Sequence, residues 1–141
     1  MSLIRLVCCI AVVITIGLHV NEGLAHKSMD PDMWMAPEQQ AHAENPVPVD
    51  KNSVVRGKKL FLQNCSVCHG ENAEGLDAQS VGLEKSPPNL KEGIKMHPDG
   101  DFFWKIQEGR GDMPSFNDDL SEEQIWEIIN YIRSEAELLE D

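Results

Sequence analysis

The first regular pattern of hydrophobic and polar side chains in this 141-residue chain begins near Ser53. Ser53 is a residue type that can cap the start of a helix. From there, side chains that would share one helical face recur at spacings of three or four residues, and they are Val54, Gly57, Phe61 and Cys65. The pattern predicts a helix that runs directly into a pair of cysteines, Cys65 and Cys68.

Two further helices are predicted downstream. The shorter one covers residues 99–107, carries four large hydrophobic side chains and is followed by two glycines that break it. The last one begins at Ser121, which can form a capping box with Gln124. Its inward face is a stripe of isoleucines, Ile125, Ile128, Ile129 and Ile132. No alternating pattern is long enough to indicate a strand, so the predicted fold is all-α.

The segments around these helices read as loops. Residues 70–88 are rich in Gly, Asn, Ser and Pro, which is typical of a long loop. Residues 26–50 contain four prolines, scattered acids and no lasting hydrophobic period. We expect an extended leader over residues 26–52 and a single folded domain over residues 53–141. The methionines and histidines of the leader are compatible with a copper site, but a plain linker is the favoured interpretation.

The first 25 residues have the three parts of a secretory signal. Arg5 precedes an uncharged hydrophobic run over residues 6–18, and small residues end at Ala25. The run is shorter than the roughly 20 residues that span a bilayer. We expect cleavage after Ala25 and an exported protein, most simply a periplasmic one. An uncleaved membrane anchor is the alternative. Cleavage would remove Cys8 and Cys9, leaving only the downstream pair.

The charge of the chain limits the classes of molecule that it is expected to bind. Twelve basic and 24 acidic side chains give a formal net charge of −12. Nucleic acid is excluded as a partner on this ground, because its phosphates demand the opposite charge. Protein partners of such a chain are expected to offer basic docking surfaces.

The stretch NCSVCHG at residues 64–70 is compatible with three chemistries. A zinc site would need two more ligands, and His97 is the only distant histidine in the region expected to fold. A thioredoxin-like pair would follow a strand and open a helix, whereas this pair closes a helix. In the third interpretation, Cys65 and Cys68 form thioethers with the two vinyl groups of a haem, and His69 becomes an axial ligand of the iron. This interpretation is the favoured one.

A second axial ligand is available in the stretch GRGDMPSF. Met113 lies there between glycines and Pro114, and a proline biases the preceding residue towards an extended conformation. Such a residue can direct its side chain to a fixed point. We therefore expect Met113 to bind the iron. Met96 is the reserve candidate.

These motifs resemble those of a known family. RGKKLFLQNCSVCHG is similar to the opening helix and haem motif of class I c-type cytochromes, including mitochondrial cytochrome c. PPNL resembles the proline loop of that family, DMPSF its methionine loop, and INYIRS its closing helix. The resemblance covers residues 53 to about 137. It implies the cytochrome c fold, a small helical domain wrapped around one covalent haem c.

The resemblance also implies roles for individual residues. The carbonyl of Pro88 would accept a hydrogen bond from His69 and orient its ring. Gly57 and Phe61 would meet Ile128 and Tyr131 where the first and last helices cross. Trp104 and Arg110 would either contact the haem propionates or serve ordinary packing and solvation.

The expected function is one-electron transfer by a soluble, exported monohaem cytochrome c rather than catalysis. With His69 and Met113 both bound, the iron would have no open position for a substrate. The rival interpretations are a haem enzyme acting on a small ligand or peroxide, the electron-transfer subunit of an oxidoreductase, and a sensor with a displaceable methionine.

Overall fold

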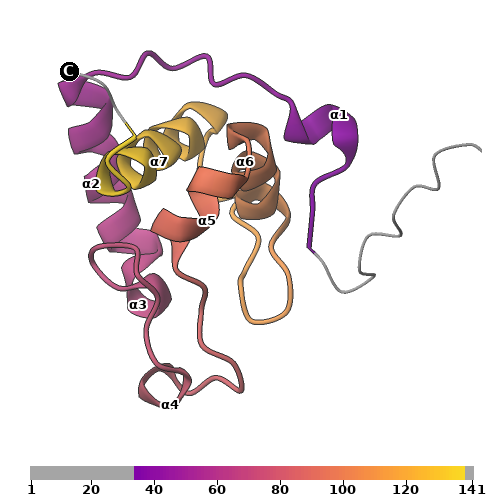
Figure 1. The fold of residues 1–141 in the computed structure, drawn as a ribbon, viewed down its shortest axis with the longest axis vertical. Coiled ribbons are helices and arrows are strands. Elements are labelled where there is room, and N and C mark those ends of the chain that lie inside the picture. The colour runs from indigo at the N-terminus through magenta and orange to yellow at the C-terminus, as the bar shows by residue number, and fades with distance from the viewer. Residues whose placement is uncertain (1–33, 139–141) are drawn as a thin grey trace, which may run out of the picture. The chain divides into compact units, whose positions relative to one another are not determined.

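The computed structural model describes residues 34–138, and within this range all regular elements are helices (Figure 1). They are α1 (Glu38–Ala41), α2 (Lys51–Asn64), α3 (Ser66–His69), α4 (Ala78–Val81), α5 (Leu90–Met96), α6 (Asp99–Glu108) and α7 (Glu122–Glu135). The all-α prediction is confirmed for this part of the chain. The expected signal sequence at residues 1–25 lies outside the described residues. Among residues 34–138, none of the helices is long and apolar enough to cross a membrane.

The start of α2 corrects one expectation. The residue that caps this helix is Asp50, whose carboxylate accepts a hydrogen bond from the Ser53 backbone N–H at 2.7 Å. The Ser53 hydroxyl in turn accepts from the Asp50 backbone N–H at 3.1 Å. Ser53 is therefore the third helical residue and the second half of a capping box, not the cap. An aspartate caps a helix as well as a serine does, so the helix starts at the earlier of the two residues.

The crossing of α2 and α7 is the centre of the fold, and it follows the expected pairing. A Cβ atom built on Gly57 would lie 1.9 Å from the carbonyl oxygen of Glu127, so the two backbones touch at this glycine. One turn further along α2, the rings of Phe61 and Tyr131 pack with their centroids 5.2 Å apart. The close approach predicted for Gly57 is confirmed.

Substituting Gly57 by alanine is therefore expected to destabilise the protein strongly. The new methyl group cannot be accommodated without separating two helix backbones, and we expect a loss of at least about 3 kcal/mol, the upper end of the range for overpacked cores. Gly82→Ala is the matched control, because open space surrounds Gly82 and only its positive φ of 73° opposes a side chain. That control should lose only about 1 kcal/mol. Urea denaturation of both variants measures the difference, and equal losses would contradict the packing described.

Helix α7 is buried more completely than its isoleucine stripe predicts. Its start is as expected, with Ser121 and Gln124 forming a reciprocal capping box. Every residue from 125 to 132 is buried, however, including the polar residues Glu127 and Asn130. Glu127 accepts a hydrogen bond from the Arg56 guanidinium at 2.5 Å, and Asn130 donates to the Ser53 hydroxyl at 3.2 Å. Partners on other elements thus allow polar side chains inside the core.

The central part of the chain is partly as expected. Helix α6 matches the helix predicted at residues 99–107 to within one residue. The loop predicted at residues 70–88 contains the single helical turn α4. Helix α5 was not predicted. It begins after the cap Asn89, whose side chain accepts a hydrogen bond from the Glu92 N–H at 3.2 Å.

The described part of the leader differs from a plain linker. Residues 34–49 pack against the domain, with α1 beside α6, and the chain then crosses the molecule to α2 (Figure 1). Trp34 and the residues that follow it belong to one compact unit. Asn45 donates a hydrogen bond to the Asn130 side chain at 2.8 Å, which ties the leader to α7.

Candidate functional site

A cavity of about 440 Å³ lies between α2, α3, α5, α6 and α7. Much of its wall is hydrophobic and comes from helices that are far apart in the sequence. These side chains are Phe61, Leu90, Phe102, Ile106, Ile128 and Ile132. Most of them belong to the core of the domain, so the cavity is a hollow within the core that opens to the surface.

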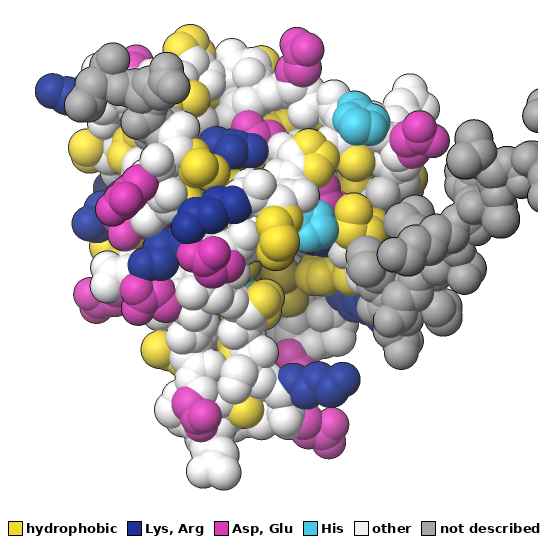
Figure 2. All heavy atoms as spheres, viewed as in Figure 1, with side chains coloured by type: hydrophobic (Ala, Val, Ile, Leu, Met, Phe, Trp, Pro, Cys, Tyr) yellow, Lys and Arg dark blue, Asp and Glu magenta, His cyan; other side chains and the backbone are white. Residues whose placement is uncertain are grey.

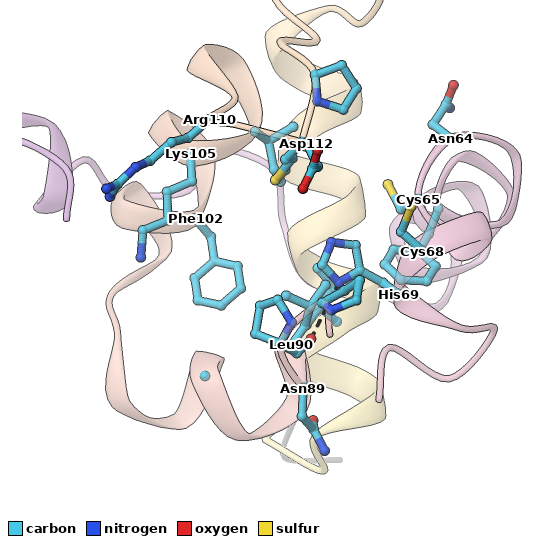
Figure 3. Close-up of a pocket in the computed structure, with 18 of the residues that line it drawn as sticks. Asn64, Cys65, Cys68, His69, Asn89, Leu90, Phe102, Lys105, Arg110 and Asp112 are labelled. Carbon is cyan, nitrogen blue, oxygen red and sulfur yellow. Dashed lines mark hydrogen bonds between the residues drawn. The ribbon is translucent and has the colours of Figure 1, made fainter. Parts of the chain in front are cut away.

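The C-x-x-C-H motif forms one wall of this cavity. Cys65 is the capping residue between the two helices, at the end of α2 and the start of α3. Cys68 and His69 lie within α3. Figure 3 shows these three side chains on one side of the cavity, facing Phe102 on the other side. Both thiols are unpaired. Burial raises the pKa of the Cys65 thiol to about 12, so its ionised form is disfavoured.

His69 is buried, and its ring contacts the proline loop. Its Nδ1 lies 3.4 Å from the carbonyl oxygen of Pro88, the contact drawn as a dashed line in Figure 3. In the tautomer that carries Nδ1–H, this nitrogen donates to the carbonyl, and Nε2 is left with a free lone pair. Burial lowers the pKa of His69, and the Pro88 carbonyl partly offsets this effect. Burial thus favours the neutral ring, the form in which imidazole binds a metal.

A glycine brings the proline loop within reach of His69. Gly75 has a positive φ of 79°, and a Cβ atom there would lie 2.3 Å from the Pro87 carbonyl oxygen. Its backbone N–H also donates to the His69 carbonyl at 2.8 Å. The loop after the motif can therefore lie between His69 and the two prolines only because residue 75 has no side chain.

The two candidate methionines differ clearly. Met113 lines the cavity and packs against the core. Its position is set by a tight turn in which the N–H groups of Arg110 and Met113 each donate to the other's carbonyl, at 2.9 and 3.1 Å. Gly109, at a φ of 65°, forms the base of this turn, where a Cβ atom would lie 2.5 Å from Pro114. Met96, by contrast, is 76% exposed and is not among the residues that line the cavity.

Several residues of the cavity were not singled out by the sequence. Trp34, Phe102 and Lys105 line it, and Figure 3 shows the Lys105 and Arg110 side chains on the side opposite the cysteines. Arg110 was proposed near the site, and the structure places it in the cavity wall. Trp104, proposed with it, is not part of the wall and instead packs edge-on against Trp34. Nothing in the local sequence around Trp34 indicates this placement, because it depends on how the leader docks.

A helical domain with a largely hydrophobic cavity beside a C-x-x-C-H motif defines a class I c-type cytochrome, in which the haem is bound covalently by the two cysteines. Residues 52–132 match the family model described as Cytochrome C oxidase, cbb3-type, subunit III, and the chain belongs to this family.

Individual relatives agree with this assignment. The cbb3-type cytochrome c oxidase subunit CcoP of Rhodobacter capsulatus is 30% identical over 150 residues, which cover 85% of this chain and 48% of that protein. Cytochrome c6 of Cladophora glomerata is 29% identical over 89 residues, which cover 62% of this chain and 94% of that protein. The chain thus spans less than half the length of this CcoP relative but nearly all of a cytochrome c6.

A solved structure shares the fold. A chain of the reducing HAO-like protein complex of Kuenenia stuttgartiensis superposes with a TM-score of 0.51 at 21% identity, covering 66% of this chain and 49% of that chain. Together with the family match and the helical structure, this likeness confirms the expected cytochrome c fold.

The cofactor of the protein is one covalently bound haem c, since the sequence contains a single C-x-x-C-H motif. The cavity fits this group. It offers two free thiols with two residues between them, a buried imidazole, a thioether and a hydrophobic lining. Basic side chains, Lys85, Lys105 and Arg110, also line it and suit the negative charge of the propionates.

Proposed function

We propose that this protein is an exported monohaem cytochrome that carries single electrons between redox proteins, with His69 and Met113 as the axial ligands of its iron. The observation that carries the proposal is the cavity itself. Met113 lines the same cavity as Cys65, Cys68 and His69, although it lies 44 positions after His69 in the chain.

Each of these residues has a distinct task. Cys65 and Cys68 would hold the cofactor through thioether bonds. Pro88 would fix the tautomer and orientation of His69, so that Nε2 is the nitrogen presented to the iron. Met113 would supply a thioether, a ligand that favours the ferrous state and raises the reduction potential. When bound, the haem supplies the one-electron Fe(III)/Fe(II) couple. The hydrophobic wall keeps water away from it.

The same arrangement opposes catalysis at the iron. Two protein ligands would leave no free position for a substrate or peroxide. The test is the binding of carbon monoxide to the reduced protein at neutral pH. We expect little binding over minutes, because Met113 would have to leave first. Rapid and complete binding would instead support a haem enzyme or a sensor.

In a second form of this proposal, the protein passes electrons as a domain of an oxidase complex and not as a free carrier. The CcoP relatives are, by name, subunits of a cbb3-type cytochrome c oxidase. A domain that passes electrons within such a complex needs the same cofactor and ligands as a free carrier. The two forms differ in whether residues 1–25 are removed as a signal, as we propose, or retained as an anchor. The N-terminal sequence of the protein isolated from its native cells distinguishes them.

The charge of the chain supports basic docking surfaces on its partners. Acidic and basic side chains are interspersed on the face drawn in Figure 2. We expect the net charge of −12 to steer the encounter.

Protein-film voltammetry tests this steering without a known partner. We expect faster electron exchange on an amine-terminated monolayer than on a carboxylate-terminated one. The difference should shrink as ionic strength rises from about 0.01 M to about 0.15 M, because the Debye length falls from about 30 Å to about 8 Å. A neutral hydroxyl-terminated monolayer is the control. Equal or faster exchange on the carboxylate surface would contradict the proposal.

A further inference from the structure

The leader is fixed to the domain by a buried carboxylate. The backbone N–H of Ala36 donates to Oδ1 of Asp101 at 2.7 Å, and Asp101 has no exposed surface. The second oxygen of this carboxylate accepts from Lys105 at 2.6 Å and faces His97 Nδ1 at 3.1 Å. Undocking the leader would leave one oxygen of a buried charge without its partner, which is costly. The contact therefore holds the leader in one place.

A glycine allows the backbone of the leader to pack closely against α6. A Cβ atom built on Gly100 would lie 2.2 Å from the Gln40 carbonyl oxygen and 2.7 Å from that of Ala41. The backbone of α1 thus rests directly on the first turn of α6. Ala36 and Ala41 are both buried in this contact. Residues 34–41 are accordingly part of the packed structure.

This docking carries Trp34 to the cavity. The Trp34 ring lines the cavity and packs edge-on against Trp104, with ring centroids 6.5 Å apart. The Lys105 ammonium lies 5.8 Å from the centre of the Trp34 ring. Lys105 therefore contacts both the anchor Asp101 and the indole at the cavity.

We propose that Trp34 covers one edge of the haem site and limits the access of water to it, and that Asp101 is the positioning residue that holds Trp34 there through Ala36. The proposal rests on the haem site described above. Burial disfavours the more highly charged ferric state, so a side chain that excludes water raises the reduction potential. The leader of this chain, which precedes the part matched by the family model, would thus tune the cofactor.

Redox titration of the full-length haem-loaded protein tests this inference. Trp34→Ala should lower the reduction potential, and Trp34→Phe, which keeps an aromatic cover, should remain closer to the wild-type value. Ala36→Pro removes the N–H that binds Asp101 and should lower the potential in the same direction. Val49→Ala is the control, because Val49 belongs to the leader, is 50% exposed and does not line the cavity. It should leave the potential unchanged.

The absorption spectrum of each variant provides a second readout. Covalent haem with unchanged axial ligation should be seen in all of them, which separates this inference from the assignment of the haem site. A wild-type potential in Trp34→Ala would overturn the role of Trp34. A lowered potential in Trp34→Ala alone, with Ala36→Pro unchanged, would overturn the role of Asp101.

Discussion

The double variant Cys65→Ala, Cys68→Ala is expected to lose both its haem and most of its helical structure. Without thioether bonds, nothing covalent retains the cofactor. The haem would then no longer occupy the cavity of about 440 Å³. Because the cavity opens to the surface, its hydrophobic lining would then face water, and a domain this small would lose a large share of the apolar burial that stabilises it. The side chains around the cavity would lose the haem as a common contact, and they include Phe61, Ile128 and Ile132.

Circular dichroism of the double variant measures this loss against the wild-type protein. The single variants Cys65→Ala and Cys68→Ala are the matched controls, because each keeps one thioether and should keep the haem and the fold. Native-like helical content in the haem-free double variant would contradict the account, since it would mean that α2 and α7 form a sufficient core alone.

The variant Met113→Ala is expected to lower the reduction potential and to abolish the weak long-wavelength absorption band of ferric iron bound to a thioether. It should also make the reduced protein bind carbon monoxide readily, because a coordination position is opened. The turn between Arg110 and Met113 is built from backbone hydrogen bonds and should survive the substitution. The effect should therefore be confined to the ligand.

Met96→Ala is the control for this experiment. Met96 is 76% exposed and lies outside the cavity wall, so its loss should change neither the potential nor the spectrum. If Met96→Ala removes the band and Met113→Ala does not, the ligand assignment is wrong while the cytochrome fold stands.

Local signals allowed much of the fold to be predicted. The capping box at Ser121 and Gln124 needs only four residues, and it appears as expected. The close approach at Gly57 was also expected, although only from the family resemblance, because the position of the partner helix is not encoded near Gly57. The start of α2 was misplaced because Asp50 and Ser53 are both good caps. Helix α5 was missed because its seven residues are too few for a clear period.

The features that escaped prediction depend on contacts between distant residues. Asp101 looks like an ordinary acid in the first turn of a helix, and its burial becomes apparent only once Ala36 docks on it. Trp34 follows a stretch without any hydrophobic period, so its place at the cavity has no local signal. The candidate site was easier to predict, because the spacing of Cys65, Cys68 and His69 is fixed within five residues by the chemistry of haem attachment.

Mass spectrometry of the denatured protein, followed by digestion, tests the central claim most directly. If Cys65 and Cys68 hold one haem c, the unfolded chain should retain the added mass of a single haem, and that mass should reside on the peptide that contains NCSVCHG. A native protein whose haem extracts into acidic organic solvent, leaving a chain of unmodified mass, would contradict the account.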